Sequence, residues 1–88
     1  MRRIAAHYIY WKDLLPLHYI EVDEDGFFIG ISPLTEEKDF TLFWDGIVYP
    51  VPESFLDELS IDSLNALIQS GISRQVEIGC RIKLCRIL

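Results

Sequence analysis

The sequence predicts a mainly β, α+β fold, a small β-sandwich or half-barrel of about six strands with one helical segment at residues 53–70. Residues 1–52 contain apolar and aromatic runs of strand composition, helical periodicity follows, and the C-terminal residues again alternate. Half of the 88 residues are apolar, which is enough for one compact core. We therefore expect one domain, residues 1–88, with β-rich (1–52), helical (53–71) and C-terminal strand (74–88) parts.

The N-terminal part begins with a strand and a hairpin. Residues 2–11 are rich in Ile, Tyr and Trp without a breaker, and both faces of this predicted strand are apolar. Residues 12–16 form a connection. Residues 17–22 and 27–31 flank Asp23-Glu24-Asp25-Gly26, where Asp-Gly favours a tight turn. The clustered carboxylates also suggest calcium. A hairpin is the favoured interpretation, because the twelfth position of an EF-hand loop, which needs Glu, is Leu34.

Two further strands are predicted at residues 40–44 and 47–51, around Asp45-Gly46. Pro50 and Pro52 are expected to stop sheet pairing, because proline has no N–H.

Apolar residues, mainly leucines, at three-to-four spacing predict the helical segment, and Gly71 is its candidate C-terminal cap. Ser60, with Asp62 and Ser63, could cap a second start, so one helix and two short helices both fit this segment. The alternation from Val76 to Leu84 predicts a last strand, which we expect beside the first.

Charge and composition exclude several classes of function. The net charge of −6 argues against nucleic-acid binding. No apolar run reaches the roughly 18 residues of a membrane span. The start has the charged residues of a signal peptide, but the apolar run after them is too short and is interrupted by His7, Lys12 and Asp13, so we expect a cytoplasmic protein. Cys80 and Cys85 are five residues apart, which places them on opposite faces of a strand, and we expect two buried free thiols.

Candidate chemistry is sparse. A core position with a hydrogen bond is the favoured interpretation of His7, and a partly exposed position that of His18. A metal site made by both with Asp13 or Glu21 is the alternative. Phosphate-loop, nucleophile-elbow and zinc-helix motifs are absent from the sequence. The tryptophans and tyrosines are expected to pack in the core rather than line a pocket.

The order of these segments resembles the small β-domain of the amidohydrolase superfamily, the dihydroorotase-like metal-dependent hydrolases, whose strands come from both ends of the chain. The hairpin is similar at His18-Tyr19-Ile20-Glu21-Val22-Asp23-Glu24-Asp25-Gly26-Phe27-Phe28-Ile29, the run into the barrel at Asp45-Gly46-Ile47-Val48-Tyr49-Pro50, and the C-terminal part at residues 64–72 and 75–84. The family's two metal-binding histidines fall on Leu56 and Glu58, which cannot replace them, and a barrel of about 250 residues has no room here.

The resemblance implies a β-domain without its catalytic barrel. We expect no catalytic residue, metal or cofactor, and a protein that associates with itself, as a homodimer, or with another protein. One alternative is a subunit that supplies the β-domain to a separately encoded barrel. Another is a small metal-binding protein or enzyme that uses His7 and His18.

Overall fold

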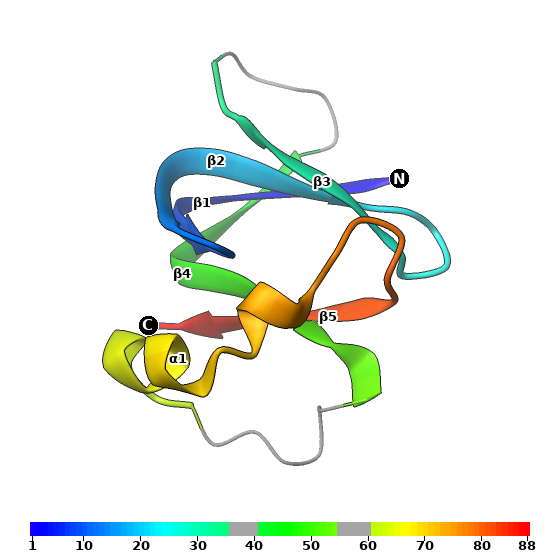
Figure 1. Cartoon of the computed structure of the whole chain (residues 1–88). Coiled ribbons are helices and arrows are strands. Elements are labelled where there is room, and N and C mark those ends of the chain that lie inside the picture. Colours follow the sequence, from blue (N-terminus) through cyan, green and yellow to red (C-terminus); the bar gives the residue numbers. More distant parts are fainter. Residues whose placement is uncertain (36–40, 55–60) are drawn as a thin grey trace.

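The computed structural model describes residues 1–35, 41–54 and 61–88, and in these ranges the chain is mainly β. Five strands form one mixed sheet, and a short helix and a 3-10 turn precede the last strand (Figure 1). The predicted fold class is confirmed, with five described strands where about six were expected. The elements are β1 (Arg2–Tyr10), β2 (Leu14–Val22), β3 (Phe28–Pro33), β4 (Thr41–Pro52), α1 (Leu64–Ser70), η2 (Ser73–Gln75) and β5 (Ile82–Ile87).

The strand order in the sheet is β3-β2-β1-β4-β5. The first three strands form an antiparallel meander. β4 returns to pair in parallel with β1, and β5 pairs antiparallel with β4. The prediction that the last strand lies beside the first is wrong, because β4 occupies the free edge of β1 and leaves β5 the outer edge of β4.

Contacts between the two ends of the sheet curl it into a half-barrel. Phe27 forms an isolated antiparallel bridge with Arg81. The Phe28 amide donates to the Cys80 carbonyl, and the Gly79 amide donates to the Phe28 carbonyl, both at 2.8 Å. In Figure 1 the turn between β2 and β3 accordingly lies beside the segment that leads into β5. The half-barrel alternative therefore describes this sheet.

The predicted hairpin turn is confirmed. Asp23 Oδ1 accepts hydrogen bonds from the amides of Asp25 and Phe27, both at 2.9 Å. Gly26 has a φ of 92°, a conformation that glycine adopts at little cost. β2 begins at Leu14, so the connection expected at residues 12–16 is shorter than predicted.

β4 corrects the prediction of two strands around Asp45-Gly46. The chain continues there as one strand of 12 residues. In the register with β1, the step from Ala6 to Tyr8 matches the longer step from Trp44 to Ile47. Gly46, with a φ of 86°, absorbs the extra residue as a β-bulge rather than a turn.

The prediction that Pro50 and Pro52 stop the sheet is also wrong, since both pair with β5. The Glu53 amide donates to the Arg81 carbonyl at 3.2 Å, so by alternation the two proline nitrogens point away from β5. β1 pairs with β4 only as far as Val48, and no ladder bond is lost on that side. There the Pro50 carbonyl instead accepts a hydrogen bond from the buried Ser73 hydroxyl at 2.9 Å.

The interior of the half-barrel contains the larger core cluster. The segment that follows α1 contributes to it through Val76, which is fully buried. The Trp11 indole donates to the Val76 carbonyl at 2.8 Å, and its ring meets the Phe28 ring edge-on. The cluster consists of Ile4, Ala6, Ile9, Ile20, Val22, Phe28, Val48, Val76 and Ile82.

A second cluster joins α1 to the other face of the sheet. Leu67 of α1 and Ile72 pack with Tyr10 of β1 and with Tyr49 and Val51 of β4. Together with the burial of Tyr19 and the position of Trp11 and Trp44 against the larger cluster, this confirms packing as the role of most aromatic residues.

The alternation of faces slips once along β1. Ala6 and Ile9 join the same cluster although they are three residues apart, whereas Tyr10 joins the other. Because the slip falls at His7 and Tyr8, these two side chains are exposed. Ile4 and Tyr10 are six residues apart, yet they lie in different core clusters.

The helical part is confirmed in its second half. Ser63 Oγ accepts from the Ala66 amide at 3.2 Å, and Gly71 ends α1 with a φ of 66°, so both caps are as predicted. The first half of the predicted segment falls mainly on residues 55–60, outside the described residues.

The predicted C-terminal strand is shorter than residues 74–88. Regular pairing begins only at Ile82, because residues 73–75 form η2 and the Cys80 amide bonds to the Glu77 carbonyl in a turn. Ile78 and Cys80, expected on a buried strand face, are therefore exposed.

Candidate functional site

The two histidines contact different groups. His7 is exposed, and its ring stands edge-on to Phe43 with the ring centroids 5.0 Å apart. His18 is half-buried, with Nδ1 2.8 Å from the Pro16 carbonyl oxygen. The predicted core position of His7 is wrong, and the partial exposure of His18 is confirmed.

The carboxylates do not complete a metal site with these histidines. Glu21 Oε2 lies 3.5 Å from Arg3 Nε in a cross-strand ion pair, and Asp23 Oδ1 is engaged by the turn backbone. Within the ranges that the structure describes, no three His, Cys, Asp or Glu side chains gather in a metal-binding group. Leu56 and Glu58, where the family's histidines would fall, lie outside those ranges.

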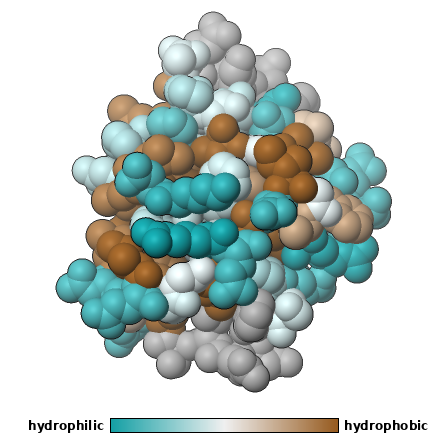
Figure 2. Space-filling model, in the orientation of Figure 1, coloured by the Kyte–Doolittle hydropathy of each residue, from teal (hydrophilic) through white to brown (hydrophobic). Residues whose placement is uncertain are grey.

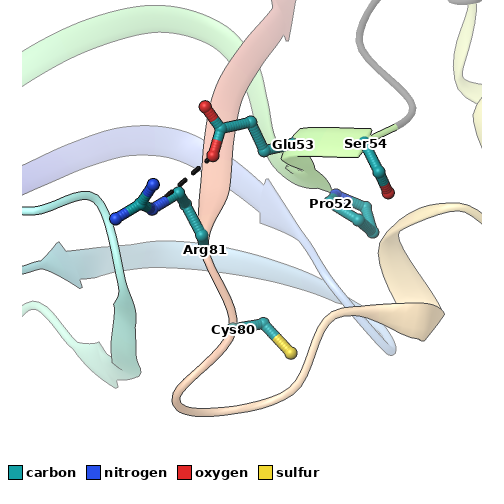
Figure 3. Close-up of a pocket in the computed structure, with 5 residues that line it drawn as sticks. All are labelled: Pro52, Glu53, Ser54, Cys80 and Arg81. Carbon is teal, nitrogen blue, oxygen red and sulfur yellow. Dashed lines mark ion pairs between the residues drawn. The ribbon is translucent and has the colours of Figure 1, made fainter.

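An open pocket of about 530 Å³ lies between the end of β4 and the start of β5, lined by Pro52, Glu53, Ser54, Cys80 and Arg81. Glu53 Oε2 and Arg81 Nε pair at 3.6 Å, and the Arg81 guanidinium also lies over the Phe27 ring. Figure 3 shows the Cys80 sulfur pointing away from this ion pair, and the Ser54 hydroxyl across the pocket from the Arg81 guanidinium. A catalytic site requires polar groups that converge on one point, and the polar groups of this pocket do not.

Both cysteines are free thiols, as predicted, but only Cys85 is partly shielded from solvent, whereas two buried thiols were expected. Cys80 is exposed at the rim of the pocket, and Cys85 is half-buried. Burial raises the pKa of the Cys85 thiol. Burial also raises the pKa of the Tyr49 hydroxyl, with the neighbouring Cys85 adding to the effect. These shifts follow from the packing of α1 on the sheet and do not identify an acid–base pair.

The most unusual surface lies on the first half of β4, which we call the open β4 edge (residues 41–45). β5 pairs with β4 only from Ile47 onward, so this edge has no partner strand on that side among the described residues. Leu42 is 56% exposed and Phe43 is 50% exposed. Their β1 partners, Ile4 and Ala5, are 0% and 1% exposed. In this part of the register the β1 residues are buried, whereas Leu42 and Phe43 of β4 are exposed.

Further apolar surface adjoins this edge across β1. The His7 ring of β1 contacts the Phe43 ring, and Leu17 of β2 lies between Pro16 and His18, which pair with Tyr8 and Ala6 of β1. Leu17 and Tyr8 are 57% and 44% exposed. By contrast, the face that carries α1 and η2 shows hydrophobic groups separated by hydrophilic side chains (Figure 2).

Sequence reasoning did not identify the open β4 edge. Leu42 and Phe43 have the composition of an ordinary buried strand, and their exposure depends on which distant segments cover this part of β4. The signal in the sequence is that Leu42 and Trp44 on one strand face and Phe43 on the other are all apolar. The same pattern also fits a strand that is covered on both faces.

No protein-family model matches the chain, and neither a curated protein nor a solved structure shows significant similarity to it. Among the described residues, no helix is long and apolar enough to cross a membrane.

Proposed function

We propose that this protein is a non-catalytic β-domain whose role is to associate with protein, in the first place with a second copy of itself. The observation that carries the proposal is the exposure of Leu42 and Phe43 on the part of β4 whose outer edge has no partner strand among the described residues. Apolar side chains on an open strand edge offer both hydrophobic contact and backbone hydrogen bonds to another chain.

Three features support a non-catalytic role. The charged groups of the open pocket, Glu53 and Arg81, pair with each other. The Asp23 carboxylate serves its own turn. Within the described ranges, the ring contacts of the histidines are to Phe43 and to the Pro16 carbonyl rather than to a carboxylate. A general acid or base would need a side chain aimed at a substrate position.

We also propose kinship with the β-domain of amidohydrolases. In support, strands from both ends of the chain share one sheet, and the β2–β3 hairpin has the turn that the resemblance implies. A cytoplasmic location is part of the proposal, because two free thiols, one of them exposed, suit a reducing compartment.

Light scattering coupled to size-exclusion chromatography tests the proposal. At high micromolar concentration we expect a mass of twice 10.2 kDa. Phe43→Lys should restore the monomer mass, because it places a charge in the contact. Ile78→Lys is the matched control, since Ile78 is 66% exposed in a turn away from β4 and its change should leave the dimer intact. A monomeric wild-type protein would refute self-association.

The alternative of a subunit for a separate barrel uses the same exposed surface. A monomeric chain that co-purifies with a barrel protein, and loses it on Phe43→Lys, would replace self-association by that alternative.

A further inference from the structure

We draw no further inference here: the strongest candidate, the exposed apolar patch of Leu42 and Phe43 on the open β4 edge, carries nothing beyond the proposed function, because nothing in the structure shows what covers it.

Discussion

Gly46 allows a direct test of the bulge that keeps β4 continuous. Its φ of 86° is unfavourable for any residue with a Cβ atom. A Cβ there would also collide with the Ile87 carbonyl oxygen and lie 3.1 Å from the Ile87 carbonyl carbon. Gly46→Ala therefore combines backbone strain with a clash against the end of β5.

Two other glycines separate these effects. Gly79 has a similar φ of 94°, but a Cβ atom added there would have no neighbour within 4 Å, so Gly79→Ala isolates the strain at about 1 kcal/mol. Gly30 has neither strain nor a close neighbour, and Gly30→Ala should be neutral or stabilise by about 0.5 kcal/mol. Displacing the end of β5 should add about 2 kcal/mol for Gly46→Ala, as overpacking does.

Urea unfolding followed by circular dichroism measures all three variants. We expect Gly46→Ala to lower the free energy of unfolding by about 3 kcal/mol, which for a domain of this size lowers Tm by about 12–24 °C. If Gly46→Ala and Gly79→Ala differ by less than about 0.5 kcal/mol, β5 does not press on the bulge as described, and the explanation of the continuous strand is wrong.

Two further predictions concern the core and the thiols. Trp11→Phe leaves the buried Val76 carbonyl without its 2.8 Å donor and should cost about 2 kcal/mol in urea unfolding, more than Trp44→Phe at the margin of the same cluster; equal losses would contradict this role of the indole. Iodoacetamide at pH 8 should label exposed Cys80 before Cys85, because burial raises the Cys85 pKa and keeps its thiol protonated. Peptide mass spectrometry measures both rates, and the difference should vanish in denaturant. Since burial raises the folded Cys85 pKa above the ordinary thiol value of 9.0, the contribution of the protonated thiol to stability is complete below that value and is lost as the pH rises through the raised pKa.

Local features of the fold could be predicted from the sequence. The Asp23 turn and the caps at Ser63 and Gly71 depend on residues within four positions of one another, and the structure contains all three. Asp45-Gly46 shows the limit of this reasoning. An Asp-Gly dipeptide can form either a turn or a bulge. Here it forms a bulge, because β1, which is distant in sequence, pairs with β4 on both sides of Gly46.

The long-range features could not be predicted in this way. Proline was expected to stop pairing, but Pro50 and Pro52 lie where β5 is the one strand paired with β4 in the described part of the chain, because the β1 ladder ends at Val48. The candidate surface depends on a similar fact, since Leu42 and Phe43 are exposed on the part of β4 that does not pair with β5 among the described residues. Residue types alone do not fix the lengths of neighbouring strands.

The position of Val76 inside the half-barrel has a consequence for how the chain folds. The Trp11–Val76 hydrogen bond spans 65 residues, and the bonds between Phe28 and the Gly79–Cys80 turn span more than half the chain. The hairpins of β1, β2 and β3 can form from local contacts, but their apolar face has no cover until the residues after α1 arrive. Folding is therefore expected to be slow for the size of the protein, because the contacts that cover the N-terminal strands join residues far apart in the sequence.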